Sequence, residues 1–506
     1  MLQSDPTVFA RAVETARLPR VHTLIDGMFV DGGGQIFSDV FPATGTQIAE
    51  VRSSSPGQVS DAVSAARQAF PAWADSSATT RAAILDRAAD TMLRDMDRLT
   101  ALVTLDNGKT SPEASFDVVS STSLTKSAAG WASRMRGSTL PLGDGYVEMT
   151  WREPVGVVAI FMPFNAPLMF CAMKIAAAIA MGNTVVVKSP EKSPLAAIAF
   201  AEYLVEAGLP NGVVNIVQGF ADVGTALVSS PEVDMVSFTG SSAVGARVGS
   251  DSVAGLKRVL LELGGKSANI IFDDAPFDSA VEGSVGAIFR NSGQRCFSGS
   301  RILVQENIAD RFIESLVAKT RSLRVGDPFD PNSDIGSMIT AQDVSRVRSI
   351  VRDAEEAGAN VLCGGDSPTG ATPESGYFLP TVIDVGDLTD LAILREETFG
   401  PVVTVQRFTD TNHAIDIANT SEYGLAGGCW TSDLAKALTV ARRIETGYFW
   451  INSYAAAAGP ESTIGGRKSS GFGTEKGEDG MLAYTAIKTV IMSESSTGTV
   501  IPMGGR

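Results

Sequence analysis

The sequence predicts an α/β protein whose parallel sheets are covered by helices on both faces. Apolar runs of strand length, such as VGVVAIFMP and NTVVVKSP, alternate with longer apolar stretches that have helical spacing. This alternation is typical of βαβ units, in which the strands are buried on both sides. The chain of 506 residues is 44% hydrophobic and contains 50 glycines, which indicates an ample core and many tight turns.

The elements follow in order along the chain. Residues 57–105 place apolar residues at helical spacing and are predicted to be helical, ending at the helix-stop sequence DNGK. Residues 137–154 alternate around Asp144-Gly145 and predict a hairpin. The α/β alternation runs from residue 155 to about residue 240, and residues 484–492 alternate as a last strand. A second α/β lobe is predicted from about residue 265 by the strands SANIIF, SRILVQE, NVLCGG, VVTVQRF and YFWIN.

The hairpin and the last strand are the two elements that do not belong to this alternation. A projecting hairpin is difficult to stabilise alone. We therefore predict that the two elements form an oligomerisation arm, by pairing with each other or with another subunit. An ordinary surface hairpin is the alternative.

Charge and hydropathy exclude two classes of partner. The net charge is −16, and an acidic surface repels the phosphates of nucleic acids and anionic lipids. The most apolar segment, residues 169–187, is interrupted by Lys174, Gly182 and Asn183 and is too short to span a bilayer. The N-terminus has no apolar secretory core. We expect no nucleic-acid partner and no membrane association.

Cys296 lies in the polar, glycine-rich stretch NSGQRCFSGS. Taken alone, it could be a nucleophile, a metal ligand, half of a disulfide or a small loop residue. The four cysteines are far apart and none belongs to a CxxC pair, so zinc-ligand spacing is absent and no metal is expected. A chain of this length folds without disulfides, which favours reduced thiols and a cytoplasmic location.

Two segments after predicted strands are candidates for ligand binding. Gly240-Ser241 opens a helix that contains Gly245, and backbone N–H groups at such a turn can hold an anionic group. A plain strand-to-helix turn is the alternative. Lys188 and Glu191 follow another apolar strand, and a carboxylate there can accept hydrogen bonds from ribose hydroxyls. A solvated loop pair is the alternative.

Two further residues suit catalysis. Glu262 lies between leucines ahead of two glycines, and an apolar setting raises a carboxyl pKa toward the range of a general base. An exposed residue at a strand end is the alternative. Asn165 lies between prolines after a strand; its amide can donate to a developing oxyanion, although turn asparagines are common.

In this order, the motifs resemble those of the NAD(P)-dependent aldehyde dehydrogenase superfamily. The resemblance spans nearly the whole chain and rests on PFNAP, KSPE, FTGSSAVG, LELGGKS, GQRC, EETFGPVV and SGFGTEKGEDG. Glu262 and Cys296 are 34 residues apart, as the base and nucleophile of that family are. The resemblance implies that Cys296 is the nucleophile, that Glu262 is the general base, and that Asn165 and the Cys296 backbone N–H form the oxyanion hole.

The resemblance also implies NAD as the cofactor and oxidation of an aldehyde to a carboxylic acid. The implied cofactor contacts are Lys188 and Glu191 at the adenosine ribose, Gly240, Ser241 and Gly245 at the pyrophosphate, Glu397 at the nicotinamide ribose and Phe399 beside the nicotinamide. The Glu191 carboxylate disfavours a ribose 2′-phosphate. Lys188 and Lys192 weaken this preference, so NADP is the alternative cofactor.

The implied architecture has three parts. A Rossmann-like parallel-sheet domain for the cofactor is expected over residues 1–128 and 150–264, and an α/β catalytic domain over 265–460. The β-hairpin oligomerisation arm is expected over 129–149 and 476–498. The arm implies a homodimer or a homotetramer.

The predicted substrate tunnel is lined by Ala166, Phe170, Met173, Arg295 and Phe297. Ala166 replaces an aromatic residue of the usual PWNFP motif, which leaves room for a bulky group. These side chains favour an apolar aliphatic or aromatic aldehyde, although Arg295 suits an anionic group. Two other interpretations remain open: a relative that transfers the acyl group to coenzyme A, and a member of the fold without catalytic activity.

Overall fold

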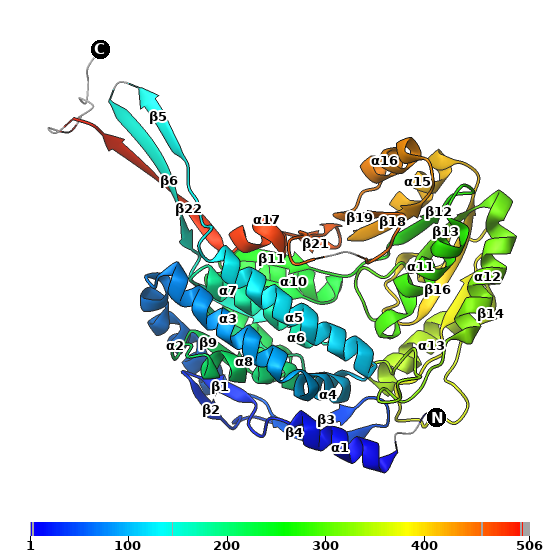
Figure 1. The fold of residues 1–506 in the computed structure, drawn as a ribbon, viewed down its shortest axis with the longest axis horizontal. Helices are drawn as coiled ribbons and strands as arrows, with labels where there is room; N and C mark the ends of the chain where they lie inside the picture. The colour runs from blue at the N-terminus through cyan, green and yellow to red at the C-terminus, as the bar shows by residue number, and fades with distance from the viewer. Residues whose placement is uncertain (1, 3–4, 144, 457–458, 496–497, 499–506) are drawn as a thin grey trace.

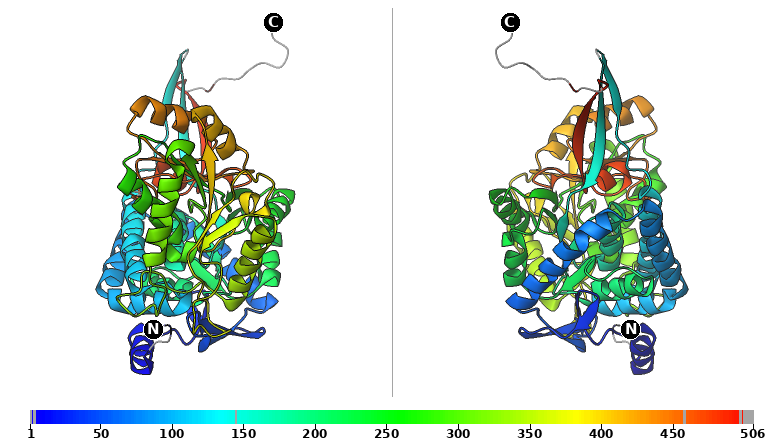
Figure 2. Two further views of the ribbon diagram at one scale, coloured as in Figure 1. Left: turned by 90° about the vertical axis from the view of Figure 1, so that its right-hand side faces the viewer. Right: turned by 90° about the vertical axis from the view of Figure 1, so that its left-hand side faces the viewer.

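The computed structural model describes residues 2, 5–143, 145–456, 459–495 and 498. Two lobes lie side by side, and a long arm of three strands projects from one of them (Figure 1). Each lobe is built on one large sheet with helices against its faces (Figures 1 and 2). The predicted α/β fold is confirmed.

An eight-stranded sheet forms the first lobe, in the order β2-β1-β9-β8-β7-β10-β11-β21. The strands from β9 to β11 are parallel, and β1, β2 and β21 pair antiparallel at the edges. The bounds are β1 (Thr23–Ile25), β2 (Met28–Val30), β7 (Val157–Phe161), β8 (Thr184–Lys188), β9 (Val214–Val217), β10 (Met235–Thr239), β11 (Arg258–Glu262) and β21 (Gly471–Phe472).

Helices cover both faces of this sheet because successive strand residues point to opposite sides. Val158 and Ile160 of β7 join a core with the helices from α3 to α8, whereas Val157 and Ala159 join a core with α2 and α9. The bounds are α1 (Pro6–Ala16), α2 (Pro56–Ala74), α3 (Ala78–Arg94), α4 (Met96–Asn107), α5 (Ser111–Trp131), α6 (Pro167–Phe170), the π-helix η1 (Cys171–Ala176), α7 (Ala177–Ala180), α8 (Leu195–Glu206), α9 (Ala221–Ser229) and α10 (Ser242–Ala254).

A seven-stranded sheet forms the second lobe, in the order β14-β15-β16-β13-β12-β18-β19. All pairs are parallel except β14 with β15. The strands are β12 (Ala268–Ile271), β13 (Arg301–Gln305), β14 (Asn360–Cys363), β15 (Thr381–Asp384), β16 (Val402–Phe408), β18 (Ala426–Trp430) and β19 (Tyr448–Ile451). The helices are α11 (Phe277–Phe289), the 3₁₀ turns η2 (Arg290–Gly293) and η3 (Glu306–Ile308), α12 (Ala309–Ser322), α13 (Ala341–Glu356), α14 (Ala392–Arg395), α15 (Thr411–Asn419) and α16 (Leu434–Arg443).

The arm is a three-stranded antiparallel sheet in the order β22-β6-β5. The predicted hairpin is β5 (Thr139–Gly143) with β6 (Tyr146–Pro154), and the predicted last strand is β22 (Thr485–Ser493). Asp144, in the predicted turn, lies outside the described residues. The strands carry exposed apolar side chains, among them Leu140, Trp151, Ile487 and Ile491. Smaller elements are β3 (Ile36–Phe41), β4 (Thr46–Arg52), β17 (Tyr423–Gly424), β20 (Arg467–Lys468) and α17 (Gly477–Leu482).

The elements differ from the predictions in several places. The helical pattern of residues 81–103 is divided at Asp95, whose φ of −94° and ψ of 24° separate α3 from α4. The arm expected over 129–149 begins inside α5 and stops within β6, which continues to Pro154. Two strands of the second lobe, β15 and β18, were not predicted. The AGGCW sequence of β18 contains two glycines, which are unfavourable in strands.

Candidate active site

A cavity of about 770 Å³ lies between the two lobes. One side is formed by residues at the carboxyl ends of β7, β8 and β10, where parallel sheets bind ligands. The other side includes Cys296, Glu397 and Phe399 from the second lobe. The cavity volume falls within the range of about 300–1,000 Å³ that is usual for ligand sites.

The loop before Cys296 has an unusual backbone. Asn291, Ser292 and Gly293 have φ values of 53°, 52° and 71°, a left-handed conformation that is costly for residues other than glycine. The Asn291 N–H donates to the Glu113 carboxylate at 2.7 Å, which helps to hold this turn. A Cβ atom on Gly293 would lie 2.1 Å from the backbone carbonyl oxygen of Gly400. The position therefore requires glycine.

Cys296 itself is partly buried and lines the cavity. A Cβ atom on Gly265 would lie 2.3 Å from the Cys296 carbonyl oxygen, so the glycines after Glu262 allow the two lobes to meet at the cysteine. Burial raises the pKa of the Cys296 thiol, and the nearby Glu397 and Glu262 carboxylates raise it further. The thiol is therefore neutral at neutral pH unless a base takes its proton.

Asn165 lies on the loop after β7, is buried and lines the same cavity as Cys296. Its side-chain Nδ2 donates to the Gln294 carbonyl oxygen at 2.9 Å. A side-chain amide nitrogen carries two hydrogens, so this contact leaves one for another acceptor. The arrangement suits an amide donor to an oxygen that becomes negative during a reaction.

Glu262 is the last residue of β11 and is 5% exposed, so it is not the surface residue considered as an alternative. Its Oε1 atom is buried without a hydrogen-bond partner among the described residues. Burial raises the pKa of Glu262 well above its ordinary value, and Glu475 raises it further, against the opposing effect of Lys174. A carboxyl group of this kind can accept a proton near neutral pH.

A buried ion pair between Lys174 and Glu475 adjoins this carboxyl group. Lys174 also donates to the Ser237 hydroxyl at 2.9 Å. Neither Lys174 nor Glu475 was predicted to belong to the site. The available signal was a single lysine in an otherwise apolar helix, which needs a buried partner.

The other end of the cavity has the features that a dinucleotide needs. Lys188 Nζ lies 3.1 Å from Glu191 Oε2. Burial acts to raise the pKa of Glu191, but Lys188, a backbone hydrogen bond and Lys192 together outweigh it and lower the pKa, so the carboxylate is ionised at neutral pH. Gly240 and Ser241 line the cavity just before α10, and the Ser241 side chain makes no capping hydrogen bond. The first N–H groups of α10 therefore suit an anion such as a pyrophosphate.

Gly245 shapes the proposed pyrophosphate end of the cavity without lining it. A Cβ atom there would lie 2.2 Å from Leu263 Cδ2, so the missing side chain lets α10 approach the sheet closely. Gly245 does not line the cavity, whereas Gly240 and Ser241 do. The residues present fit a bound NAD, with apolar walls from Phe161, Phe238 and their neighbours.

Glu397 and Phe399 lie at the end of the cavity near Cys296. Glu397 Oε1 accepts from the Gly265 N–H at 3.0 Å, and burial raises the pKa of Glu397 to about 7. The Phe399 ring lies edge-on to Phe164 with centroids 5.7 Å apart. Phe164 stands where the predicted motif usually has tryptophan.

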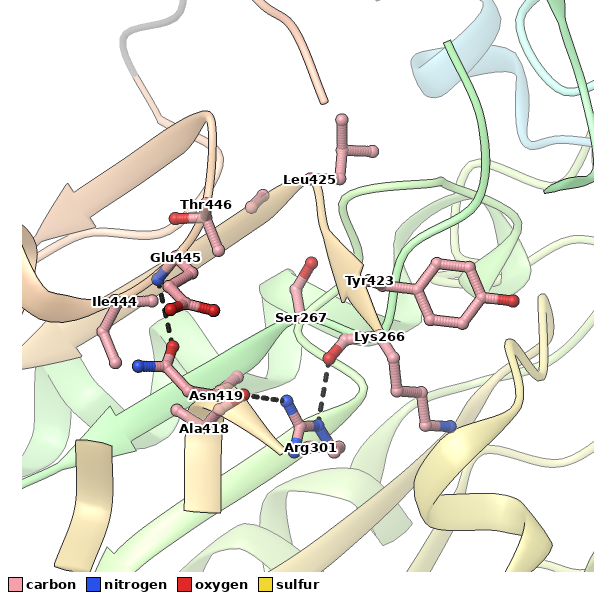
Figure 3. Close-up of a pocket in the computed structure, with 12 residues that line it drawn as sticks. Lys266, Ser267, Arg301, Ala418, Asn419, Tyr423, Leu425, Ile444, Glu445 and Thr446 are labelled. Atoms are coloured by element: carbon pink, nitrogen blue, oxygen red, sulfur yellow. Dashed lines mark hydrogen bonds between the residues drawn. The ribbon is translucent and has the colours of Figure 1, made fainter. Parts of the chain in front are cut away.

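A second cavity in the second lobe is lined by residues that include Lys266 and Arg301 (Figure 3). Its volume is about 10 Å³, room for about one water molecule and no substrate. Lys266 Nζ donates to the Thr398 hydroxyl at 3.2 Å. Burial lowers the pKa of Lys266 to about 7.

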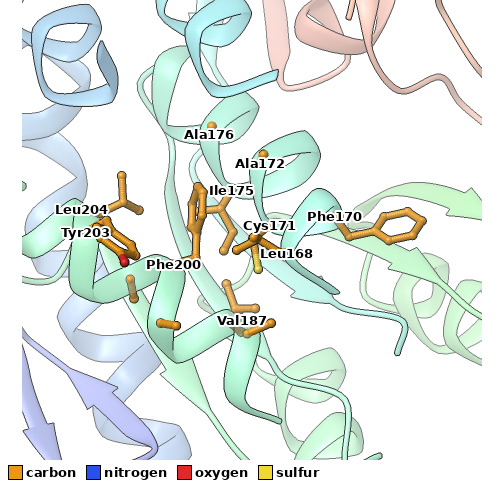
Figure 4. Close-up of a cluster of buried hydrophobic side chains, with 14 of the residues drawn as sticks. Leu168, Phe170, Cys171, Ala172, Ile175, Ala176, Val187, Phe200, Tyr203 and Leu204 are labelled. Carbon is orange, nitrogen blue, oxygen red and sulfur yellow. The ribbon is translucent and has the colours of Figure 1, made fainter. Parts of the chain in front are cut away.

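The five predicted tunnel residues divide into two groups. Phe170 lines the cavity, and its ring points away from the hydrophobic cluster around Cys171 (Figure 4). Ala166, Met173, Arg295 and Phe297 are not among the lining residues of the 770 Å³ cavity. The Arg295 guanidinium donates to the Gly286 and Ala287 carbonyl oxygens at 3.1 and 3.0 Å and packs 4.9 Å from the centroid of the Phe297 ring.

Residues of α13 also line the cavity and were not predicted. Asp343 pairs with Lys192 at 2.7 Å, and Arg346 lies nearby. These charged residues lie on one face of an amphipathic helix, and no motif distinguished them from surface charges.

The model of the aldehyde dehydrogenase family matches residues 29–490, which include the whole cavity. The chain belongs to the aldehyde dehydrogenase family. Enzymes of this family are NAD(P)-dependent oxidoreductases that act on aldehydes, so the predicted enzyme class is confirmed.

Individual members of the family are similar over most of the chain. A mitochondrial aldehyde dehydrogenase from Mesocricetus auratus is 43% identical over 90% of this chain and 91% of its own length. A betaine aldehyde dehydrogenase from Rhizobium leguminosarum bv. trifolii (strain WSM2304) is 40% identical over 93% of this chain and 97% of its own.

Solved structures of the family have the same fold. A putative aldehyde dehydrogenase from Burkholderia cenocepacia has a TM-score of 0.93 and 40% identity, covering 96% of this chain and 100% of that one. A betaine aldehyde dehydrogenase from Staphylococcus aureus, solved in complex with NAD+, has a TM-score of 0.94 and 32% identity, covering 99% and 100%. In the described part of this aldehyde dehydrogenase, no helix is long and apolar enough to cross a membrane.

Proposed function

We propose that this enzyme oxidises an apolar aliphatic or aromatic aldehyde to the carboxylic acid with NAD, through a thioester on Cys296. One observation carries the proposal. Cys296 and the Asn165 amide line the same cavity. Glu262 is not among the lining residues, but its carboxyl group raises the pKa of the Cys296 thiol and is buried without a partner for Oε1 among the described residues. A nucleophile, an oxyanion donor and a base are therefore available together.

In the proposed mechanism, the Cys296 thiol loses its proton to solvent, and the thiolate adds to the aldehyde carbon. The carbonyl oxygen becomes negative, and the free Asn165 N–H and the Cys296 backbone N–H donate to it. When bound, NAD supplies the acceptor for the hydride, and the adduct becomes a thioester. Glu262 then takes a proton from a water molecule whose oxygen adds to the thioester carbon. The C–S bond breaks, the carboxylic acid leaves, and the Cys296 sulfur takes the proton from Glu262, which restores the thiol and the carboxylate.

For the cofactor, Lys188 and Glu191 would hold the adenosine ribose, and Gly240 and Ser241 would hold the pyrophosphate. Glu397 would bind the nicotinamide ribose, with Phe399 beside the ring. The NAD complex of the Staphylococcus aureus relative supports this assignment. Support for an apolar substrate comes from Phe170, whose ring faces the cavity. The guanidinium of Arg295 is instead hydrogen-bonded to two backbone carbonyl groups, which weakens its case as a carboxylate binder.

We also propose the division into a cofactor domain (1–128 and 150–264), a catalytic domain (265–460) and an arm (129–149 and 476–498). The exposed apolar side chains of the arm support self-association as a homodimer or homotetramer. The free thiols of Cys171, Cys296, Cys363 and Cys429 support a reducing, cytoplasmic location.

A panel of aliphatic, aromatic and carboxylated aldehydes tests the proposed activity, with NADH absorbance as the measurement. We expect turnover with NAD, highest for the apolar aldehydes. Acceleration by free coenzyme A would instead favour the acyl-transferring alternative. No turnover with either dinucleotide on any aldehyde, and no selective labelling of Cys296 by a thiol reagent, would favour a non-catalytic protein.

Cofactor choice gives a second prediction. The ionised Glu191 carboxylate is expected to repel a ribose 2′-phosphate, so the parent enzyme should have a lower KM for NAD than for NADP. Glu191→Gln removes the negative charge and keeps the shape of the side chain. The KM for NADP divided by the KM for NAD should then fall by about 10-fold, since about 1.4 kcal/mol of lost repulsion is a factor of ten. Glu422→Gln, a change of a carboxylate that does not line the cavity, is the control. An unchanged ratio in Glu191→Gln would contradict this assignment.

A further inference from the structure

We propose that Lys109 is a positioning residue for the oxyanion amide of Asn165, acting through the backbone carbonyl group of that asparagine. The inference rests on the proposed role of Asn165. It concerns the DNGK sequence, which ends α4 and was recognised in the sequence only as a helix stop.

Lys109 is buried together with its ionic partner. Its side chain is 1% exposed and pairs with the 8% exposed carboxylate of Asp117 on α5, at 2.6 Å. Removing two charged groups from water is costly, and replacing such a pair by neutral residues is often without loss of stability. Stability alone therefore does not explain why a lysine lies here.

The ammonium group of Lys109 contacts the backbone of Asn165. Lys109 Nζ donates to the backbone carbonyl oxygen of Asn165 at 2.9 Å, and the Asn291 side-chain Nδ2 donates to the same oxygen at 2.9 Å. The neighbouring Asn107 Nδ2 donates to the Phe164 carbonyl oxygen at 2.7 Å. Side chains of one turn thus hold two consecutive carbonyl groups, those of Phe164 and Asn165.

The hydrogen bonds of Asn165 connect Lys109 to the reacting atoms. Lys109 holds the backbone carbonyl group of Asn165. The side-chain amide of the same asparagine would bind the substrate oxygen. That amide also donates to the Gln294 carbonyl oxygen, two residues before Cys296. The backbone and the side chain of Asn165 are therefore both held, and the second hydrogen of its side-chain Nδ2 is left to donate in the cavity that Asn165 lines. Oxyanion donors are effective because they are fixed before the charge develops.

The turn itself is fixed in place. Gly108 has a φ of 81°, and a Cβ atom there would lie 2.2 Å from the Ser337 hydroxyl oxygen. The Gly108 carbonyl oxygen accepts from the Ser337 N–H at 2.9 Å. The second lobe therefore holds the turn that carries Lys109, and the ammonium group transmits this position to Asn165.

A double-mutant cycle tests the proposal. Lys109→Met alone would leave a buried, unpaired Asp117, so the test variant is Lys109→Met/Asp117→Asn, which removes the donor and leaves a neutral core. We expect kcat to fall by about 10- to 100-fold, less than the 10²–10³-fold cost of losing a whole oxyanion donor. On an Asn165→Ala background the same pair of changes should lower kcat by less than about threefold, because Lys109 acts only through the missing amide.

Two controls separate positioning from general damage. Arg98→Met/Glu202→Gln removes an ion pair between α4 and α8, away from the cavity, and should leave kcat unchanged. The thermal midpoint and the rate of Cys296 alkylation should be the same in the Lys109→Met/Asp117→Asn variant as in the parent. A parent-like kcat in that variant, slower alkylation, or a full multiplicative loss on the Asn165→Ala background would each overturn the proposal.

The placement of Asn165 has a readout that does not depend on turnover. In a crystal structure of Lys109→Met/Asp117→Asn, we expect the contact between Asn165 Nδ2 and the Gln294 carbonyl oxygen to lengthen or break. A retained 2.9 Å contact with an unmoved peptide group would overturn the inference. Failure of the proposed function would appear separately, as a parent chain that oxidises no aldehyde.

Discussion

Cys296→Ala is expected to lower aldehyde oxidation by about 10⁴-fold or more, because no other group can form the covalent adduct. The fold should survive, since the side chain is small, partly buried and free of a disulfide. NADH production measures the loss, and an unchanged thermal midpoint shows that the protein is folded. Cys363→Ala changes another half-buried thiol away from the cavity and should keep the parent rate.

The raised pKa of Cys296 adds a pH prediction to this experiment. Alkylating reagents react with the thiolate, and a raised pKa means that the thiolate fraction is small at neutral pH. The alkylation rate of the enzyme without cofactor should therefore keep rising with pH through pH 9. A rate that is already constant at pH 7 would mean that the thiol has an ordinary or lowered pKa.

Glu262→Gln is expected to separate the two halves of the reaction. The change keeps the shape of the side chain and removes the base that activates water, so steady-state turnover should fall by about 10²–10⁴-fold. Reduction of the cofactor precedes hydrolysis, so a rapid burst of about one NADH per Cys296 should remain. Stopped-flow absorbance measures the burst, and mass spectrometry should find the acyl group on Cys296.

Hydroxylamine and pH supply the controls. Hydroxylamine cleaves thioesters without a general base and should restore turnover in Glu262→Gln. The base must be deprotonated to act, and its pKa is raised. Activity of the parent should therefore be present above that raised pKa and lost as pH falls through it, at a pH above the ordinary carboxyl range near 4.3. A variant that shows no burst at all would mean that Glu262 is needed before the thioester forms.

Much of the site was predictable because each of its parts follows a strand in a recognisable local sequence. Glu262, Asn165, Lys188 and Gly240 all come at the carboxyl ends of first-lobe strands, and the topology brings those ends to one edge. The roles themselves came from the family resemblance, since the residues alone left an ordinary turn or a solvated loop open at each position.

Other parts depend on contacts between distant segments, which no local pattern encodes. Lys174 meets Glu475 across 301 residues of chain, and Lys109 meets Asn165 across 56, so both contacts form only in the folded protein. The direction in which a side chain points is also not encoded in a local sequence pattern. Arg295 precedes the nucleophile in sequence, yet its guanidinium turns to the carbonyl groups of α11.

The antiparallel pairing of β6 with β22 has a consequence for how the enzyme is made. Tyr146 pairs with Ser493, and Lys174 and Glu475 are 301 residues apart. β21, which borders Glu262, also comes from the C-terminal segment. During synthesis, the ribosome must release almost the entire chain before these contacts can form. The nascent first lobe therefore carries an unpaired strand edge and a lysine without its buried partner, and it stays exposed to aggregation until translation ends.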